Sequence, residues 1–577
     1  MAMQDHLKTR ANLKLDRRRL MTAALAGSLV AGAATSADTA QAKTSAPKAT
    51  GPDPFRGSDG LAVAKTEAGR VRGYIHNSIL TFKGIPYGAD TGGAARFLPA
   101  QKPKPWAGLR SAMQYGPVSP QPDRDGWKND EEAWMFAWND GIQGEDCLRT
   151  NVWTPGLDGK KRPVMVWIHG GGHYAGSGQE QPGYDGENLA RTGDVVVVSL
   201  NHRLGAMGYI DFSRFGPEYK ASANIGMQDI VLALEWVRDN IANFGGDPGC
   251  VTIMGQSGGG AKVSTLMVMP KAAGLFHRAV VQSGSSHLIG VPSDANRLTD
   301  QVLVELGAAG SSMEAIKALP YKDLVQAAIR AQAKLRKPGQ TNAISARGPR
   351  AGDFVPIVDG EIVVRHPFEK DAPPVMKPIP MMVGTVLNEQ VHALNHPEYE
   401  RMTEEEAKAN LLKIYGAPSE GIFAAVRRRN PKMKPFDVYS ICCAGSARAR
   451  AQYQAKMKSA QGGAPAFLFW FTWQTPVLDG RPRAFHCSEI AFAFNNTDVA
   501  GSLTGGSARA RKLGHAMSQA WINFARHGNP NHADLPKWPA YSPAQPATMI
   551  FDDACQVQIA PDREEQALIS AALGIPA

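Results

Sequence analysis

Val251-Thr252-Ile253-Met254-Gly255-Gln256-Ser257-Gly258-Gly259 is the stretch of this 577-residue chain that decides its fold. The apolar residues 251–254 predict a buried strand, and residues 260–269 predict a helix. The Gly-x-Ser-x-Gly between them fits the sharp turn that exposes a serine hydroxyl at the end of a strand. The motif alone is weak, and a glycine-rich turn with an inactive serine is the alternative. A phosphate-binding loop is excluded, because Ala261 stands where that loop requires lysine.

A second glycine run, His169-Gly170-Gly171-Gly172, follows another apolar stretch at residues 164–168. When a hydroxyl attacks a carbonyl carbon, negative charge develops on the carbonyl oxygen, and backbone N–H groups can stabilise it. Glycines let the backbone approach a substrate without a side chain in the way. We therefore expect the N–H groups of Gly171, Gly172 and Gly258 to form an oxyanion hole. A merely flexible turn is the alternative.

Short apolar runs alternate with amphipathic stretches along most of the chain. The runs typical of strands buried on both faces are 164–168, 195–200, 251–254, 279–282, 381–383 and 467–471. Residues 224–244 have apolar residues at spacings of three and four, as on one face of a helix. This alternation predicts an α/β fold with a large, mostly parallel, twisted central sheet flanked by helices. Residues 296–345 and 400–460 predict helical insertions packed over the sheet.

The first 42 residues resemble an export signal. Arg17-Arg18-Arg19-Leu20-Met21 begins a twin-arginine pattern, an apolar stretch follows, and Ala40-Gln41-Ala42 fits a cleavage site. The apolar stretch is shorter than the ~20 residues needed to span a bilayer, so we expect no stable membrane span. We expect a twin-arginine-type signal peptide over 1–42, cleaved near Ala42, with export to the periplasm or the medium. A flexible leader over 43–60 and a single catalytic domain over 61–577 should follow; a disordered basic tail is the alternative for the first segment.

Composition narrows the possible partners. The formal net charge is +10, but residues 1–42 contain six basic and three acidic side chains, so part of the excess lies there. There is no long Lys/Arg block in the sequence, and no nucleic-acid partner is predicted. Six cysteines without a Cys-x-x-Cys pair favour neither a disulfide framework nor a structural zinc site. We expect neither metal nor cofactor, and the sequence leaves the oligomeric state open.

Several motifs, in order, resemble the type-B carboxylesterase/cholinesterase family. Residues 244–259 resemble its active-site signature, Glu145-Asp146-Cys147-Leu148 its second signature, and Phe82-Lys83-Gly84-Ile85-Pro86-Tyr87 its entry motif. Trp521-Ile522-Asn523-Phe524 resembles its C-terminal helix, so the resemblance covers about residues 60–560. It implies the α/β-hydrolase fold, with helical insertions over the active site. It also implies a serine hydrolase that cleaves carboxylic esters to acid and alcohol.

The resemblance also places the partners of Ser257. A serine nucleophile needs a base, and the base needs an acid that holds its tautomer. The family acid lies in a Gly-Thr-x-x-x-Glu segment after a strand, which here ends at Glu389. The family base lies in an Ala-x-His-x-x-Glu-Ile segment, which here contains His486. We expect His486 to take the proton of Ser257, which forms an acyl-enzyme intermediate that water then hydrolyses.

Four positions depart from the family pattern. Gly258 replaces the usual alanine and should keep its N–H in place. Gln256 stands where glutamate is usual, so a cationic, choline-like substrate is disfavoured. His173 follows the glycine run where an aromatic residue is common, which predicts a more polar acyl side. Ser119 stands where many relatives have a cysteine, so Cys147 is expected to be a free, buried thiol.

The candidate substrate pocket combines Gln256 and His173 with three tryptophans, Trp127, Trp134 and Trp138. A tryptophan-rich packing loop is an equally good interpretation of those three. The expected substrate is a small-molecule ester, uncharged, and small to medium or aromatic; the sequence leaves the physiological ester open. Two other functions are also open, a binding protein without catalysis and an amidase or lactonase with the same residues.

Overall fold

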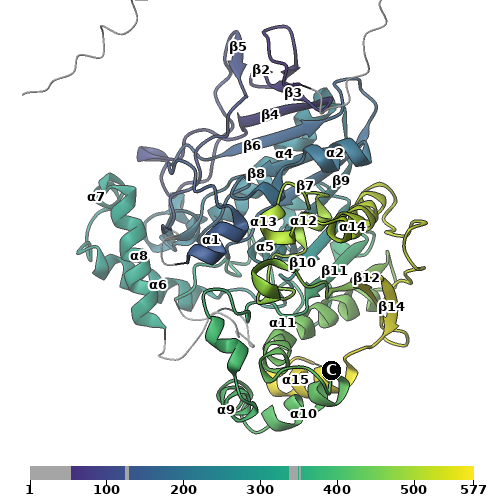
Figure 1. The fold of residues 1–577 in the computed structure, drawn as a ribbon. Coiled ribbons are helices and arrows are strands. Elements are labelled where there is room, and N and C mark those ends of the chain that lie inside the picture. The colour runs from purple at the N-terminus through teal and green to yellow at the C-terminus, as the bar shows by residue number, and fades with distance from the viewer. Residues whose placement is uncertain (1–53, 124–128, 337–348, 350–351, 577) are drawn as a thin grey trace, which may run out of the picture. The chain divides into compact units, whose positions relative to one another are not determined.

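The computed structural model describes residues 54–123, 129–336, 349 and 352–576, all within one compact unit, Pro52–Ala577. The predicted signal peptide lies outside the described residues. An eleven-stranded sheet crosses the unit, and a three-stranded sheet lies near its first residues (Figure 1). The strands are β1 (Val63–Lys65), β2 (Arg70–Arg72), β3 (Tyr74–His76), β4 (Ile79–Pro86), β5 (Leu109–Ser111), β6 (Arg149–Thr154), β7 (Arg162–Ile168), β8 (Val196–Leu200), β9 (Gly246–Gln256), β10 (Arg278–Gln282), β11 (Met381–Val386), β12 (Ala466–Phe471), β13 (Ala547–Phe551) and β14 (Gln556–Ile559).

The large sheet is mixed, with a parallel centre. Its order is β14-β13-β12-β11-β10-β9-β7-β8-β6-β4-β3, and every neighbouring pair from β13 to β8 is parallel. The four strands at its two edges pair antiparallel. All six apolar runs of the sequence fall in these parallel strands, which confirms the predicted α/β fold. Every residue of β7, β11 and β12 is buried, because helices cover both faces of the sheet.

The helices connect and cover these strands. They are α1 (Asp130–Phe136), α2 (Glu187–Gly193), α3 (Gly205–Tyr209), α4 (Ile225–Asn240), α5 (Gly258–Leu266), α6 (Pro292–Glu305), α7 (Met313–Ala318), α8 (Tyr321–Leu335), α9 (Glu404–Tyr415), α10 (Ser419–Arg429), α11 (Pro435–Ala460), α12 (Ile490–Ala493), α13 (Gly501–Thr504), α14 (Ala508–His527) and α15 (Arg563–Leu573). The predicted helix at 224–244 is α4 followed by a 3-10 turn, Ile241–Phe244. The two predicted helical segments are α6 to α8 and α9 to α11, and these lie in separate groups in Figure 1.

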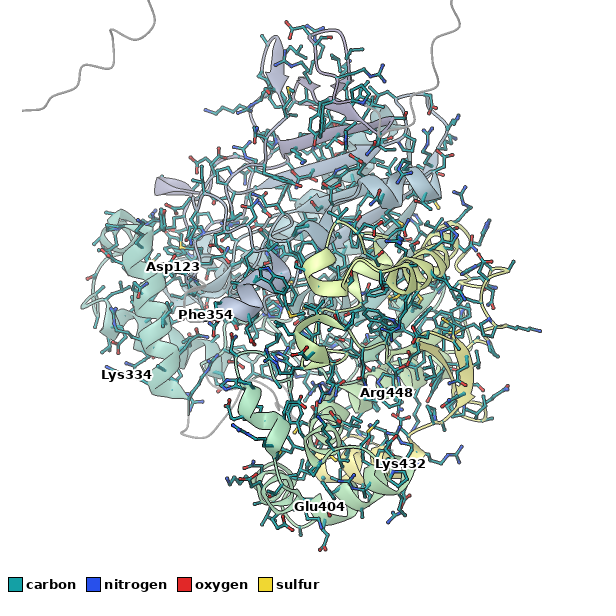
Figure 2. The ribbon with its side chains drawn as sticks, viewed as in Figure 1. Asp123, Lys334, Phe354, Glu404, Lys432 and Arg448 are labelled. Atoms are coloured by element: carbon teal, nitrogen blue, oxygen red, sulfur yellow. The ribbon has the colours of Figure 1, made fainter. Side chains whose placement is uncertain are left out.

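Two buried ion pairs join distant segments of the unit. Arg203 donates to Asp229 of α4 at 2.6 Å, and Arg448 of α11 (labelled in Figure 2) donates to Asp562 at 2.9 Å. All four side chains are almost fully buried. Removing one partner of such a pair leaves an uncompensated buried charge and costs roughly 3–5 kcal/mol. These pairs therefore fix α4 and α11 against the segments around them.

The topology brings several loops to one edge of the sheet. Parallel strands end at the same edge, so the segments that follow β7, β9, β10 and β11 begin there. These segments start with the glycine run, Ser257, Ser283 and the loop to Glu389. Within the described part of the chain, no helix is both long and apolar enough to cross a membrane.

Candidate active site

Ser257 occupies a strained turn between β9 and α5. Its backbone has φ 57° and ψ −125°, a conformation that non-glycine residues rarely adopt. A Cβ on Gly255 would lie 2.5 Å from the carbonyl carbon of Gly259, and a Cβ on Gly259 would overlap the carbonyl oxygen of Ile168. Only glycine therefore fits at positions 255 and 259, two residues before and two residues after the serine. The backbone N–H of Ser257 donates to the carbonyl oxygen of Gln282 at 2.8 Å, which fixes the turn to β10.

The glycine run after β7 packs against the same turn. Gly171 and Gly172 have φ of 75° and 62°, in the left-handed region that favours glycine. A Cβ on Gly258 would overlap the carbonyl oxygen of Gly172, so the two backbone segments are in direct contact. Among the described residues, the N–H groups of Gly171 and Gly172 donate to no protein acceptor. Gly258 is the first residue of α5, where a backbone N–H has no partner within the helix.

His486 and Glu389 form a hydrogen-bonded pair. Nδ1 of His486 lies 2.5 Å from Oε2 of Glu389, and the backbone N–H of His486 donates to the carbonyl oxygen of Glu389 at 2.9 Å. The other carboxylate oxygen, Oε1, accepts from the backbone N–H of Val386 at 3.2 Å. Burial lowers the pKa of His486, but the hydrogen bond and the negative charge of Glu389 outweigh it, so the pKa is raised above 6.5. The pair can therefore hold one imidazole tautomer and stabilise an imidazolium.

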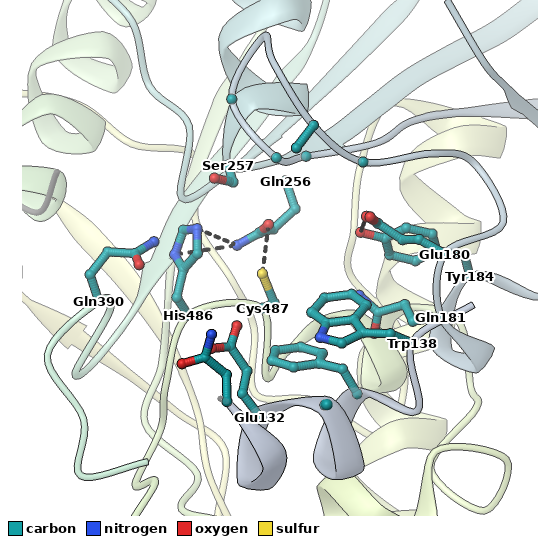
Figure 3. A pocket seen from close by; sticks show the side chains of 18 of the residues that line it. Glu132, Trp138, Glu180, Gln181, Tyr184, Gln256, Ser257, Gln390, His486 and Cys487 are labelled. Atoms are coloured by element: carbon teal, nitrogen blue, oxygen red, sulfur yellow. Dashed lines mark hydrogen bonds between the residues drawn. The ribbon is translucent and has the colours of Figure 1, made fainter. Parts of the chain in front are cut away.

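Ser257 and His486 line the same cavity and lie next to each other in Figure 3. No hydrogen bond joins the two described side chains in this structure. Instead, the amide nitrogen of Gln256 lies 3.3 Å from Nε2 of His486. Catalytic hydrogen bonds are often long before substrate binds. The arrangement brings a hydroxyl, an imidazole and a carboxylate together, as acyl transfer requires.

Gln256 lies between the imidazole and a thiol. Its side-chain oxygen accepts from the Sγ–H of Cys487 at 3.1 Å, which leaves its amide nitrogen facing His486 (Figure 3). Gln256 is fully buried. The residue therefore presents an uncharged donor to the imidazole, where a glutamate would present a charge.

A cavity of about 340 Å³, here called the aromatic cavity, opens on the imidazole side of Ser257. Its described lining includes Phe136, Trp138, Tyr174, Tyr184, Gln256, Ser257, His486 and Cys487. The rings of Phe136 and Trp138 stack with centroids 4.4 Å apart. Trp138 therefore lines a cavity that has room for an aromatic or apolar group.

The other two predicted tryptophans are not among the described residues that line this cavity. Trp134 is 54% exposed and is absent from the lining, which corrects the sequence prediction for it. The reason is helical geometry: Glu132, Ala133 and Phe136 of α1 face the cavity, so Trp134 points to another side of the helix. Trp127 lies outside the described residues.

His173 is absent from the described lining of the aromatic cavity. It lines a second cavity of about 310 Å³, here called the polar cavity. The described lining of this cavity includes Gly172, His173, Ser257, Gly258, Ser283, Ser285, Ser286, His287, Asp353 and Arg450. Burial, with the nearby charge of Lys262, lowers the pKa of His173 well below its usual range. His173 is thus an uncharged polar group at neutral pH, in the place predicted to be more polar.

The sequence analysis missed Lys262 of α5. Its side chain is fully buried, and Nζ donates to the carbonyl oxygen of His169 at 3.0 Å. Burial lowers its pKa to about 7, although the charge of Glu180 opposes that effect. Lys262 thus fixes the carbonyl group of His169, the residue directly before the three glycines. A lysine within an otherwise apolar and small-residue helix was the signal available in the sequence.

Ser119 and Cys147 are as the sequence predicts. Cys147 is a free cysteine and is fully buried. The hydroxyl of Ser119 accepts from the backbone N–H of Leu204 at 3.0 Å. Burial raises the pKa of the Cys147 thiol to about 12, so it is protonated at neutral pH and is a poor nucleophile.

Comparison with known proteins identifies the family. The sequence profile of the carboxylesterase family matches residues 61–568. The chain belongs to the carboxylesterase family. Among curated carboxylesterase relatives, the para-nitrobenzyl esterase of Bacillus subtilis (strain 168) is 32% identical over 87% of this chain and 97% of its own length. The phenmedipham hydrolase of Pseudarthrobacter oxydans is 32% identical over 85% and 95%.

Solved carboxylesterase structures are similar over most of the chain. An esterase from anaerobic Clostridium hathewayi, described as able to hydrolyse aliphatic aromatic polyesters, has a TM-score of 0.74 and 36% identity. The match covers 90% of this chain and all of that chain. The carboxylesterase of Geobacillus stearothermophilus at pH 6.2 has a TM-score of 0.73 and 33% identity, over 88% and 99%. The fold is that of an α/β-hydrolase, and the protein is a carboxylic ester hydrolase of the serine hydrolase type.

Proposed function

We propose that Ser257 is the nucleophile, with His486 as the base and Glu389 as the acid that orients it. The 2.5 Å contact between His486 and Glu389 supports this assignment most strongly, because both residues, together with Ser257, line one small cavity of about 140 Å³. His486 removes the hydroxyl proton as Ser257 attacks the ester carbonyl carbon. The imidazolium then protonates the leaving alcohol, and water, deprotonated by the same imidazole, releases the acid.

We propose that the N–H groups of Gly171, Gly172 and Gly258 bind the carbonyl oxygen during attack. Each lies next to Ser257 in the described structure, and none is used by a protein acceptor that would compete with substrate. Removing one such donor typically lowers kcat by about 10²–10³.

The test is Ser257→Ala with a 4-nitrophenyl ester and a fluorophosphonate probe. We expect kcat to fall by about 10⁴–10⁶ and labelling to disappear, because no other group replaces the nucleophile. Ser570→Ala on the remote helix α15 is the matched control and should label normally. A Ser257→Ala protein with near-normal turnover would contradict the assignment. Comparison of the ester with the matching anilide would show whether the protein also cleaves amides.

We propose an uncharged ester, small to medium or aromatic, as the substrate. The aromatic cavity has aromatic side chains that suit an apolar group on one side of Ser257, and Gln256 supplies no charge to attract a cation. Glu132 and Glu180 also line this cavity, and Glu180 accepts from the hydroxyl of Tyr184 at 2.8 Å. A panel of esters from acetyl to long-chain and aromatic acyl groups on purified protein tests this. Faster hydrolysis of a choline ester than of its uncharged isostere would contradict it.

We also propose that residues 1–42 direct export through a twin-arginine route in a bacterium, with cleavage near Ala42. The arginine pair, the apolar stretch and the Ala-Gln-Ala site support this. Expression of the full chain in a bacterium with that route, followed by mass spectrometry of the N-terminus, should find a protein that begins at residue 43. The double variant Arg17→Lys, Arg18→Lys should retain the uncleaved chain in the cytoplasm. Unchanged export of that variant would contradict the proposal.

A further inference from the structure

Three cavities are lined by Ser257, and the aromatic and polar cavities receive different parts of an ester. The third, of about 140 Å³, is lined by His486 and Glu389 and also by Ser283 and Arg450 of the polar cavity. The leaving alcohol takes its proton from His486, so the alcohol must lie on the imidazole side. His486 lines the aromatic cavity but is absent from the described lining of the polar cavity. If Ser257 and His486 act as proposed, on which this inference rests, the polar cavity receives the acyl group.

The polar cavity is lined by hydrogen-bonding groups without protein partners. Ser283, Ser285, His287 and His173 each line it. Each has a buried polar atom that no described protein group satisfies: Oγ of both serines, Nδ1 of His287 and Nε2 of His173. Leaving buried polar groups unpaired is costly, and most such groups in proteins are paired. These atoms have almost no surface open to solvent in this structure, so a substrate reaches them when the side chains turn toward the cavity. A hydroxyl on the acyl group would then supply the missing partner, which an apolar acyl group cannot.

Ser283 shows that this lining is held in a strained geometry. It follows β10 directly and has φ 47°, a left-handed conformation that is costly for a serine. Its backbone N–H donates to the carbonyl oxygen of Gly384 at 2.8 Å, which fixes the segment to β11. The chain then runs through Ser285 and His287 along the cavity.

The charges around the polar cavity are balanced. Arg450 and Asp353 both line it; Asp353 accepts from Arg336 at 3.1 Å, and the negative charge of Glu389 acts on Arg450. Burial, with the nearby charges of Arg450 and His366, lowers the pKa of His287 to about 4. Both imidazoles of the cavity are therefore neutral at pH 7. Neither a carboxylate nor an ammonium group would find an excess of opposite charge.

We propose that the polar cavity binds an uncharged acyl group that bears a hydroxyl near the ester carbonyl, so that the preferred substrates are esters of hydroxy acids. The hydroxyl donates to and accepts from the side chains of Ser285, His287 and His173. A site that hydrogen-bonds a substrate hydroxyl discriminates strongly against the analogue without it, because its own polar groups stay unpaired.

Two esters that differ in one group test the proposal: ethyl 3-hydroxybutanoate and ethyl 3-methylbutanoate. The hydroxyl of the first is replaced by a methyl group in the second, and the alcohol is the same. We expect kcat/KM to be at least about tenfold higher for the hydroxy ester. Equal rates, or faster hydrolysis of the methyl ester, would overturn the proposal. Ethyl hydrogen succinate is the charged arm, and its faster hydrolysis than the hydroxy ester would replace the proposal with an anion-binding site.

Variants show whether these residues cause the preference. In the double variant Ser285→Ala, His287→Leu, the ratio of kcat/KM values for the hydroxy and methyl esters should fall by about tenfold. Ser285→Ala alone should lower this ratio less. The single variant replaces the double variant in this test if thermal unfolding shows that the double variant does not fold. Ser570→Ala is the matched control for the ratio. An unchanged ratio in the folded variants would overturn the proposal.

The proposed nucleophile and this inference fail in different ways. If Ser257→Ala still hydrolyses both esters, the nucleophile is wrong. If hydrolysis depends on Ser257 but shows no preference for the hydroxyl, only the acyl preference is wrong.

Discussion

Glu389 raises the pKa of His486 above 6.5 through its hydrogen bond and its charge. If His486 is the base, as we propose, its imidazole must be neutral to accept the proton of Ser257, so this pKa sets the pH at which the hydrolase can act. Activity should therefore fall as the pH drops through that raised pKa. At higher pH, the neutral base is fully populated and the rate should reach a plateau.

Glu389→Gln tests this relation. We expect kcat to fall by about 10³–10⁴, because the amide no longer stabilises the imidazolium or fixes its tautomer. We also expect the acid limb of the remaining kcat/KM profile to move to lower pH, since the main cause of the raised pKa is gone. Glu420→Gln, an exposed position on α10, is the matched control. An unshifted acid limb in the Glu389 variant would show that another group titrates.

Gly258 is the point at which helix α5 meets the loop after β7. Although relatives usually have alanine here, a Cβ at this position would overlap the carbonyl oxygen of Gly172. Gly258→Ala should therefore displace the glycine run and lower kcat by about 10²–10³, the cost of one lost donor, with a smaller effect on KM. Gly60→Ala, whose Cβ would meet nothing within 4 Å, is the control. Normal kcat in the Gly258 variant would show that the loop moves freely.

Lys262 connects α5 to the loop after β7 through its hydrogen bond to His169. Its effect on stability depends on pH. Its pKa is about 7 in the folded protein against 10.5 for a free lysine, so below pH 7 a charge is buried at full cost. From pH 7 to 10.5 the folded form binds fewer protons than the unfolded form, so this cost shrinks as the pH rises. The thermal midpoint of Lys262→Met minus that of the natural protein should therefore be largest near pH 6. This difference should decline toward pH 10.

The same variant should also lower kcat by about tenfold, less than a lost oxyanion donor, because the His169 carbonyl loses its bond but the amides remain. Lys271→Met, at an exposed site, is the control for both measurements. A pH-independent difference in midpoint would show that folding does not lower the pKa of Lys262.

How far the sequence predicts these elements depends on the range of the interactions. The strand at residues 251–254 and the turn at Ser257 are local patterns, and both are found as predicted. The side of α1 that Trp134 occupies depends on how that helix packs, which its spacing in the sequence does not determine. Lys262 escaped prediction for a similar reason, since its role depends on a carbonyl group 93 residues away. The charge balance of the polar cavity likewise requires side chains from four separate segments.

At the scale of the whole molecule, the described hydrophobic core begins at Ala62 and lies within one unit, Pro52–Ala577. A chain that begins at residue 52 should therefore have a thermal midpoint within about 2 °C of the full chain, and the same kcat. Differential scanning calorimetry and a 4-nitrophenyl ester assay on both proteins would check this. A markedly lower midpoint would show that the leader contributes to stability.

Glu389 and His486 are 97 positions apart in the chain, and Ser257 precedes both, directly after β9. If these three residues act as proposed, they come together only when β9, β11 and the loop before α12 have docked. An incompletely folded chain should then be inert toward esters, and activity should appear late, together with tertiary assembly. Recovery of esterase activity after denaturation would therefore report the assembly of the tertiary structure, which secondary-structure spectroscopy alone does not measure.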